Sequence, residues 1–354
     1  MKVLGIESSC DETAASVVEN GRTLLSNVVN SQIDIHAVYG GVVPEVAARS
    51  HIEVINPVIN QALTEANCTW DDIDAIAVTY APGLVGSLLV GTLAARTLAT
   101  LKNKPLYPIH HVEAHVYANF LNKTAPEFPM LALIVSGGHS QLVLFKDHGD
   151  YELLGQTQDD AVGEAFDKVA KIIGLPYPGG PSVAAAALSG NPHKYTLPKA
   201  KLKDPYNFSF SGLKTAVLRA VQKEVGANFT FPSHELPALL NDVQRADFSA
   251  SFQRTAIETL VDKAQLAFRD YAPKSVVIAG GVAANQELRR QLSERLPLHI
   301  DYAPMNLCTD NAAMIATLGY YYAQKNQPVD PLELEVVPSL SMTKTAWHHN
   351  NSLS

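Results

Sequence analysis

Hydrophobic and polar positions in the first part of the chain follow two different periods. Three short runs are rich in apolar and β-branched residues, and Asn20-Gly21 separates the second run from the third. Asn-Gly between two such runs is a strong signal for a tight β-hairpin. A longer segment with helical spacing comes next, and another strand pattern follows it. The expected strands cover residues 2–8, 13–18, 23–30 and 73–79, and the expected helix covers residues 44–66.

The same order of patterns returns in the second half of the chain. Strand-like runs precede a helical segment, and a further apolar run ends at Gly280-Gly281 before another helical segment. These elements are expected at residues 130–135, 141–145, 151–156, 161–173, 275–279 and 285–296. Two α/β lobes of like order around a cleft are the plan of the actin, sugar kinase and Hsp70 ATPase (ASKHA) superfamily. We therefore predict a duplicated α/β fold of that type.

Length and composition agree with a two-lobed globular protein. The 354 residues exceed what one hydrophobic core usually organises, and 47% of them are hydrophobic. The expected boundaries are 1–125 for the N-terminal lobe, 126–335 for the C-terminal lobe and 336–354 for a polar, frayed tail. The tail contains Thr343, Thr345, His348, His349 and Asn350.

Cysteine usage and the N-terminus favour a cytoplasmic location. Cys10, Cys68 and Cys308 lie far apart without a CxxC pair, which is typical of a reducing compartment. The apolar run at the N-terminus is too short for a signal peptide. Residues 84–101 are apolar but include Arg96 and many small residues, so a buried helix is expected there, not a membrane span. The net charge of -8 means that any RNA contact is local or shared with a partner.

A pair of histidines carries the clearest chemical signal. His111 and His115 are four residues apart at an expected strand-to-helix junction, so both imidazoles lie on one helical face and can hold one cation. Packed or capping histidines are the alternative. A zinc protease would need His-Glu-x-x-His, whereas Glu113 lies two residues from each histidine, about 200° around the helix. Asp310 offers a carboxylate before an expected helix and could complete an open site, although an N-cap is the more common role of such an aspartate taken by itself.

Glycine pairs and carboxylates mark a second candidate region. Gly137-Gly138 and Gly280-Gly281 each follow an expected strand, where the backbone can approach a phosphate or ribose closely. Glu164 and Asp167 share one helical face and could hold ribose hydroxyls, although a solvated charged face is the commoner explanation. The rigid turn at residues 178–181 could present backbone to a nucleotide, or simply connect two elements.

A basic segment precedes alternating aromatic residues. Such a pattern suits RNA backbone and unpaired bases, with a surface loop beside an edge strand as the alternative. The residues are Lys194, Lys199, Lys201, Lys203, Tyr206, Phe208 and Phe210.

Ordered sequence blocks over nearly the whole chain closely resemble the bacterial tRNA threonylcarbamoyladenosine transferase family, once called O-sialoglycoprotein endopeptidase and related to the Kae proteins. The blocks lie at residues 5–13, 39–45, 82–86, 111–115, 135–139, 163–168, 208–214, 280–285 and 308–311. The family's usual Arg-Pro-Arg-Trp-Pro ending is replaced here by residues 336–340, and residues 184–187 are all alanine.

The resemblance implies a set of site residues. One divalent metal, usually iron with zinc as the alternative, would be held by His111, His115 and Asp310. A threonylcarbamoyl-adenylate would lie along Ile134, Val135, Ser136, Gly137 and Gly138. Asp167 and Gly180 would contact the ribose side, and Asn285 the base.

The implied reaction is attack of the exocyclic amine of a tRNA adenosine on the carbamoyl carbon, with adenosine monophosphate leaving. The target would be the adenosine 3′ to the anticodon in tRNAs that read codons beginning with A. Asp11 and Glu12 follow the first expected strand and are candidates for accepting the proton. The implied partners are tRNA, an adenylate-making synthase, an inactive paralogue of the same fold (TsaB-like) that pairs through the N-terminal lobe, and a P-loop ATPase (TsaE-like). No association with a membrane is implied.

Two rival functions stay open on the residues alone. An ATP-dependent kinase of the same superfamily would carry an Asp-x-Gly phosphate loop after its first strand, where this chain has Glu7-Ser8-Ser9. A non-catalytic nucleotide-binding scaffold would need neither a metal triad nor the Asp11-Glu12 pair.

Overall fold

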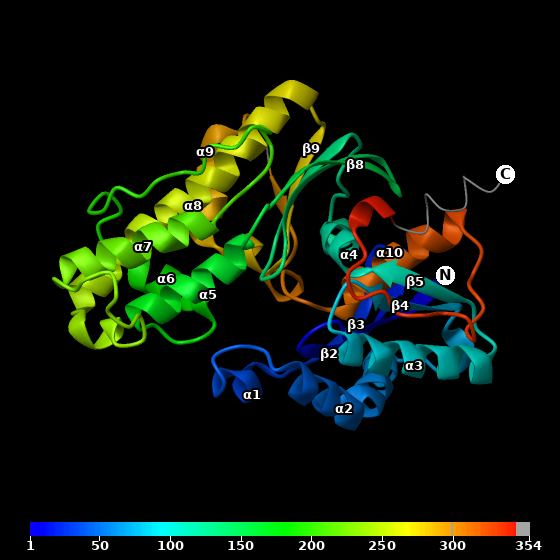
Figure 1. Ribbon diagram of the computed structural model, residues 1–354. Coiled ribbons are helices and arrows are strands. Elements are labelled where there is room, and N and C mark those ends of the chain that lie inside the picture. The colour runs from blue at the N-terminus through cyan, green and yellow to red at the C-terminus, as the bar shows by residue number, and fades with distance from the viewer. Residues whose placement is uncertain (299, 345–354) are drawn as a thin grey trace. The chain divides into compact units, whose positions relative to one another are not determined.

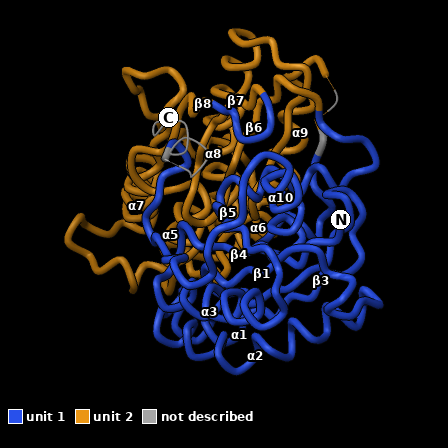
Figure 2. The backbone as a smooth tube through the Cα atoms, turned by 90° about the vertical axis from the view of Figure 1, so that its right-hand side faces the viewer, with its two compact units in different colours: residues 1–126, 147–151, 302–354 blue, residues 127–146, 152–301 orange. Residues whose placement is uncertain are grey.

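The computed structural model describes residues 1–298 and 300–344, and Figure 1 traces its helices and strands in chain order. The chain divides into two compact units, coloured separately in Figure 2. Unit 1 comprises residues 1–126, 147–151 and 302–354, and unit 2 comprises residues 127–146 and 152–301. The first division lies beside the expected boundary at residue 126, whereas residues 302–335, expected in the second lobe, belong to unit 1.

Unit 1 is built on a five-stranded sheet of order β3-β2-β1-β4-β5. β1 pairs antiparallel with β2 and parallel with β4, and a hydrophobic cluster with Leu4, Ile6 and Ile76 lies between the sheet and α2 and α3. Its elements are β1 (Lys2–Glu7), β2 (Glu12–Glu19), β3 (Thr23–Ser31), α1 (Ile33–Ala37), α2 (Pro44–Glu65), β4 (Ala75–Ala81), α3 (Val85–Lys102), β5 (Leu106–His110), α4 (His111–Tyr117) and α10 (Ala312–Lys325).

Two glycines explain how α10 reaches the sheet of unit 1. A Cβ atom at Gly5 in β1 would overlap the carbonyl oxygen of Ala312, and one at Gly319 would lie 2.5 Å from Cβ of Ala77 in β4. Helix and sheet therefore approach closely only because these two positions lack side chains. This packing brings a late segment of the chain into unit 1 and carries Asp310 with it.

Unit 2 repeats the strand plan of unit 1. Its five-stranded sheet has the order β10-β9-β6-β7-β8, with β6 antiparallel to β7 and parallel to β9. Read from β8, this is the order of the first sheet, which confirms the predicted duplication and the ASKHA-type fold. Its elements are β6 (Met130–Val135), β7 (Ser140–Asp147), β8 (Asp150–Gln156), α5 (Val162–Ile173), α6 (Gly179–Ala187), α7 (Ser211–Glu224), α8 (Asp242–Tyr271), β9 (Ser275–Ala279), α9 (Gln286–Arg295) and β10 (Asp301–Tyr302).

The predicted hairpin at Asn20-Gly21 is confirmed, because both residues have positive φ (53° and 66°) between β2 and β3. Such a conformation suits the two-residue turns that connect antiparallel strands.

The expectation of a buried helix at residues 84–101 is wrong in one respect. Helix α3 buries one face, but Val85, Leu89 and Leu93 are about half exposed. None of the helices in the described ranges is long and apolar enough to cross a membrane.

The start of the expected tail is attached to unit 1. Val337 N donates to Tyr80 O, Gly83 N donates to Pro338 O, and Met342 is buried. These contacts hold residues 337–342 on unit 1, so the expectation of a frayed tail is wrong for this segment. Thr345, His348, His349 and Asn350 lie outside the described residues.

Candidate metal centre and nucleotide edge

The two histidines and Asp310 meet in unit 1. His111 and His115 lie one turn apart on α4, which follows directly from β5. Their Nε2 atoms lie 3.6 and 3.3 Å from Oδ1 of Asp310, and one ligand atom from each residue falls within 4.8 Å of the other two. Both ring nitrogens of His115 are buried without a hydrogen bond among the described residues. A cation bound to Nε2 would give that nitrogen the partner that a buried polar atom requires, so the donor set fits a metal ion.

Glu7 orients His111 from the end of β1. Its Oε2 accepts a hydrogen bond from Nδ1 of His111 at 3.0 Å, which leaves Nε2 to face Asp310. Burial would lower the pKa of His111, but the carboxylates of Glu7 and Asp310 raise it to about 9. Burial would likewise raise the pKa of Glu7, yet the charge and hydrogen bond of His111 hold it below its usual value. A carboxylate behind a ligating histidine is the usual outer support of a metal site.

The alternative explanations of these residues can now be compared with the structure. Asn311, not Asp310, caps α10, because its Oδ1 accepts from the backbone N–H of Met314. The Asp310 carboxylate is therefore not engaged as an N-cap. Glu113 lies on the other side of α4 and accepts a hydrogen bond from the Tyr151 hydroxyl at 3.2 Å. Burial raises the pKa of Glu113 to about 8, and its contact with Tyr151 does not fit the water-activating glutamate of a zinc protease.

The connection between β1 and β2, which contains Asp11 and leads directly into Glu12 at the start of β2, is held by two helices of unit 1. The carbonyl oxygen of Cys10 accepts from Ser87 Oγ of α3 at 3.1 Å and from Nε2 of His51 in α2 at 3.0 Å. Since Nε2 must donate to a carbonyl, Nδ1 of His51 accepts from the Thr13 hydroxyl at 2.7 Å. Burial, Asp310 and Asp11 together raise the pKa of Glu12 to about 10. The charge of Asp310 thus contributes directly to the raised pKa of Glu12.

In unit 2 the residues predicted to bind the adenylate gather at one edge of the sheet. β6 and β9 are parallel neighbours, so their carboxyl ends, Val135 and Ala279, lie at the same edge. Ligands of open α/β sheets bind at such ends. Ile134 and Val135 are fully buried in β6 and can offer only backbone groups.

The turn after β6 is open on one side. Ser136 N donates to His139 O at 2.8 Å, and a Cβ atom at Gly137 or Gly138 would meet nothing within 4 Å. On the other side the turn is tightly packed. A Cβ atom at Gly163, at the start of α5, would lie 2.6 Å from Ser136 O. The exposed backbone of Gly137 and Gly138 therefore has room for a ligand.

The other three predicted ligand residues surround this edge in different ways. Asp167 Oδ1 accepts from Gly179 N at 2.6 Å and so fixes the start of α6 on α5. Gly180 has open space where a Cβ atom would lie. Asn285 caps α9, because its Oδ1 accepts from Leu288 N at 3.1 Å. Glu164, the other carboxylate considered, pairs with Lys168 on the helix surface.

The expected RNA-binding segment is only partly available. Lys199 contacts Glu258 and Asp262 of α8 at 2.9 and 2.8 Å, so its charge is neutralised within unit 2. Phe208 and Phe210 are fully buried, so the prediction is wrong for these two aromatic residues. Their alternation reflects packing of an extended segment against the core, not a platform for bases.

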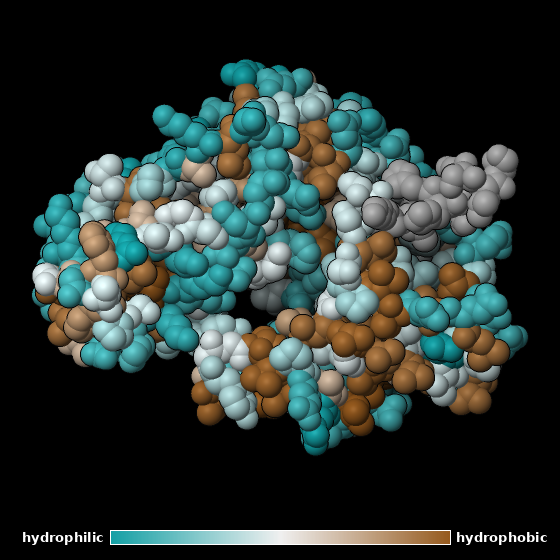
Figure 3. Space-filling model, viewed as in Figure 1, coloured by the Kyte–Doolittle hydropathy of each residue, from teal (hydrophilic) through white to brown (hydrophobic). Residues whose placement is uncertain are grey.

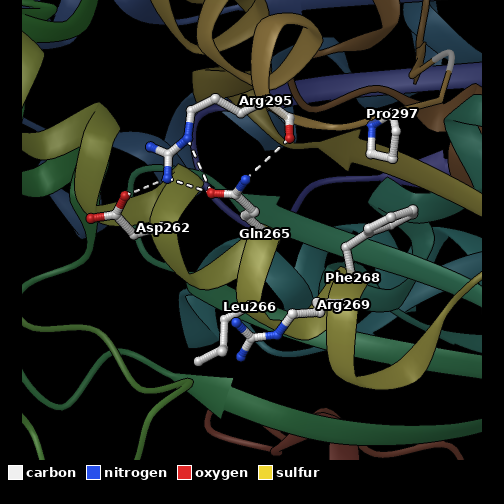
Figure 4. A pocket seen from close by; sticks show the side chains of 7 residues that line it. All are labelled: Asp262, Gln265, Leu266, Phe268, Arg269, Arg295 and Pro297. Atoms are coloured by element: carbon white, nitrogen blue, oxygen red, sulfur yellow. Dashed lines mark hydrogen bonds and ion pairs between the residues drawn. The ribbon is translucent and has the colours of Figure 1, made fainter.

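A surface hollow of about 600 Å³ lies between α8 and the end of α9 in unit 2 (Figure 4). Three of its polar side chains, those of Asp262, Gln265 and Arg295, bind one another. Arg295 donates to Asp262 Oδ1 at 2.7 Å and to Gln265 Oε1 at 2.6 Å, and Gln265 donates to Arg295 O at 3.2 Å. With its polar groups satisfied in this way, the hollow is a weaker ligand site than the edge at β6 and β9.

The chain is similar in sequence and in fold to known proteins. The profile of the family described as tRNA N6-adenosine threonylcarbamoyltransferase matches residues 23–317. Curated proteins of that name are 50% identical in Thermomicrobium roseum, covering 95% of both chains, and 52% identical in Symbiobacterium thermophilum, covering 96% of both. Among solved structures, HypF from T. kodakarensis has a TM-score of 0.59 at 15% identity over 91% of this chain and 48% of its own. An activator of a 2-hydroxyisocaproyl-CoA dehydratase from Clostridium difficile has a TM-score of 0.51 at 13% identity over 95% of this chain and 99% of its own. These two likenesses concern the fold.

Proposed function

This chain belongs to the tRNA N6-adenosine threonylcarbamoyltransferase family of tRNA-modifying transferases, and we propose that it moves the threonylcarbamoyl group of an adenylate to a tRNA adenosine. The acceptor in this proposal is the exocyclic amine of the adenosine 3′ to the anticodon in tRNAs that read codons beginning with A. The observation that carries the proposal is the convergence of His111, His115 and Asp310 within 4.8 Å in unit 1. A kinase of the same superfamily would need an Asp-x-Gly loop where this chain has Glu7-Ser8-Ser9.

The adenylate donor is assigned to the sheet edge of unit 2. The open backbone at Gly137, Gly138 and Gly180 suits phosphate and ribose oxygens, because amides in turns and at helix starts donate to anions. Asp167 would accept from ribose hydroxyls through the oxygen that Gly179 does not use. Asn285 is assigned to the adenine base, with Ile134, Val135 and Ser136 forming the wall behind the donor.

His111, His115 and Asp310 would hold one divalent metal ion, and iron is the first candidate with zinc as the second. Such an ion supplies positive charge for phosphate oxygens and fixes the direction of the donor. Two histidines and one carboxylate leave coordination positions open for a substrate. Because adenosine monophosphate is a good leaving group, the chain's own residues have to orient the reactants more than to form a covalent bond with them.

Proton removal from the attacking amine is assigned to Asp11 or Glu12. They follow Cys10, whose carbonyl oxygen is held by His51 and Ser87, and Glu12 begins β2, which limits the movement of both. Burial and neighbouring carboxylates raise the pKa of Glu12 to about 10. With that pKa the Glu12 carboxyl already carries a proton near neutral pH and cannot accept another, so Asp11 is the first candidate.

A partner surface is proposed on α2 and α3 of unit 1. Figure 3 shows apolar side chains gathered over these two helices, and Ile52, Val85, Leu89 and Leu93 are 63, 56, 44 and 56% exposed. A helix-sized apolar patch of this kind is typical of a protein interface. We assign it to the inactive paralogue of the same fold. A P-loop ATPase, the adenylate synthase and tRNA complete the set of proposed partners in the cytoplasm.

A reconstituted transfer assay tests the proposed function. Purified chain, partners, adenylate donor and tRNA are combined, and threonylcarbamoyladenosine is measured by nucleoside mass spectrometry. The His111→Ala/His115→Ala variant should lose both bound metal and product while keeping its fold, and exposed His234→Ala is the control. Full metal content in the double variant would contradict the assigned ligands, and phosphate transfer from ATP to a small acceptor would favour the kinase.

A further inference from the structure

The side chain of Asn285 is held by two contacts within unit 2 that together determine the orientation of its amide. Leu288 N is a backbone donor, so the atom it reaches at 3.1 Å must be the oxygen Oδ1. Nδ2 then faces Gln253 of α8, and the Gln253 atom at 2.9 Å must be its acceptor Oε1. Neither amide can be turned over without placing two donors or two acceptors against each other.

The contact of Gln253 with Asn285 is not a by-product of other hydrogen bonds made by the Gln253 side chain. Among the described residues, its side chain makes no hydrogen bond other than the one to Asn285, and it is half-buried on α8. A long polar side chain is held in one rotamer at an entropic cost, so a single partner indicates that the contact itself matters. In contrast, Gln265 on the same helix forms hydrogen bonds with the side chain and the carbonyl of Arg295 (Figure 4).

We infer that Gln253 is a positioning residue for the nucleotide site and that it acts through Asn285; the inference rests on the proposed adenylate site. With one N–H bound to Gln253 and one oxygen lone pair bound to Leu288 N, the Asn285 amide keeps one N–H and one lone pair. This is the pair with which an asparagine contacts the adenine edge, donating to a ring nitrogen and accepting from the exocyclic amine. Gln253 thereby fixes the plane in which the base is recognised.

Titration calorimetry with adenosine monophosphate tests the inference on the full chain. Gln253→Leu should weaken binding about three- to tenfold, the range of one neutral hydrogen bond. Gln253→Glu keeps an acceptor and should restore most of the affinity. Asn285→Ser keeps an oxygen for the helix cap but removes the amide, and should also weaken binding. Gln265→Leu is the matched control and should bind like the unmodified chain.

The double variant Gln253→Leu/Asn285→Ser separates the possible outcomes. If Gln253 acts through Asn285, the double variant binds no more weakly than Asn285→Ser alone, because the two losses are not additive. Additive losses, or unchanged affinity in Gln253→Leu, would overturn the inference while leaving the proposed function standing. Absence of adenosine monophosphate binding by the unmodified chain would overturn the adenylate site and the inference with it. Gln253→Met replaces the leucine variant if the latter does not fold.

In the reconstituted transfer assay, Gln253→Leu should raise the KM for the adenylate donor and leave kcat unchanged. Such a split is expected when a residue contributes equally to binding of the substrate and of the transition state. A residue with a purely structural role would lower the amount of active protein and hence kcat. A fall in kcat with unchanged KM would therefore contradict the positioning role.

Discussion

At the scale of single residues, the orientation of His111 depends on a carboxylate that is distant in sequence but adjacent in the fold. Glu7 Oε2 holds Nδ1 of His111, so Nε2 is the nitrogen that faces Asp310. We predict that Glu7→Gln weakens metal binding about 10- to 100-fold, as changes behind ligating histidines usually do. Competition with a chromogenic chelator measures the affinity, and Glu45→Gln on the surface is the control. Equal affinities of the Glu7 and Glu45 variants would count against the assigned support.

The sequence predicts some of these residues and misses others for a physical reason. His111 and His115 can be paired by their spacing, because a four-residue interval places two side chains on one helical face. Asp310 lies near the two histidines only because α10 packs on the sheet of unit 1. No local sequence pattern predicts that packing. Glu7 and Gln253 were missed because each acts on a residue that is distant in sequence. An outer support of this kind becomes visible only in the folded chain.

At the scale of elements, the contact of α10 with β1 depends on Gly5. We predict that Gly5→Ala lowers the free energy of unfolding by about 1–3 kcal/mol, because the new methyl group would overlap the Ala312 carbonyl. Urea unfolding measures the change. Gly212→Ala in the first turn of α7 has open space and should be neutral or slightly stabilising. If Gly5→Ala unfolded at the same urea concentration as the unmodified chain, the close approach would be wrong.

A second element-scale prediction concerns His148, which stacks on Tyr321 of α10 with ring centroids 3.9 Å apart. Burial lowers the pKa of His148 from 6.5 to about 4. The unfolded chain therefore takes up a proton first, and the stabilisation present above pH 6.5 is lost as the pH falls toward 4. For this partly exposed ring the loss is roughly 1–2 kcal/mol. His148→Phe should flatten the dependence of unfolding free energy on pH over that range, and exposed His234→Phe should not.

Periodic patterns predicted most elements well, because each period follows directly from helix or strand geometry. The wrong predictions are of two kinds. One is an apolar helix face that is exposed, and the other is a pair of core aromatic residues that the sequence suggested as a binding surface. Helix α3 is mostly apolar, which suggested burial, yet Leu89 and Leu93 remain exposed. Phe208 and Phe210 looked like a binding platform, yet they are core residues of unit 2. Hydrophobicity alone does not distinguish a core from a surface that another protein covers.

At the scale of the whole molecule, the chain has the fold and the family of a tRNA-modifying transferase but little of the charge that tRNA binding requires. Its net charge is -8, and Lys199 within the basic segment is already neutralised by Glu258 and Asp262. Positive surface for a polyanion must then come largely from elsewhere. We propose that a partner protein supplying this positive surface binds to the exposed apolar stripe on α3. Val85, Leu89 and Leu93 are spaced four residues apart, so they share one helical face, and Ile52 is exposed on α2, which packs against α3.

We therefore predict that Leu89→Asp/Leu93→Asp abolishes stable association with the inactive paralogue and lowers multiple-turnover transfer at least tenfold. Two charges at the centre of an apolar interface lose their hydration without gaining a partner, and this penalty exceeds the net energy of most transient contacts. Both positions are on the surface, so the fold and adenosine monophosphate affinity should be unchanged. Sedimentation velocity with the purified paralogue measures association, and Leu188→Asp, on the 89% exposed leucine of unit 2, is the control. If the double variant still sedimented as a complex with full turnover, the patch on α2 and α3 would have to serve another partner, and the paralogue would bind elsewhere on the chain.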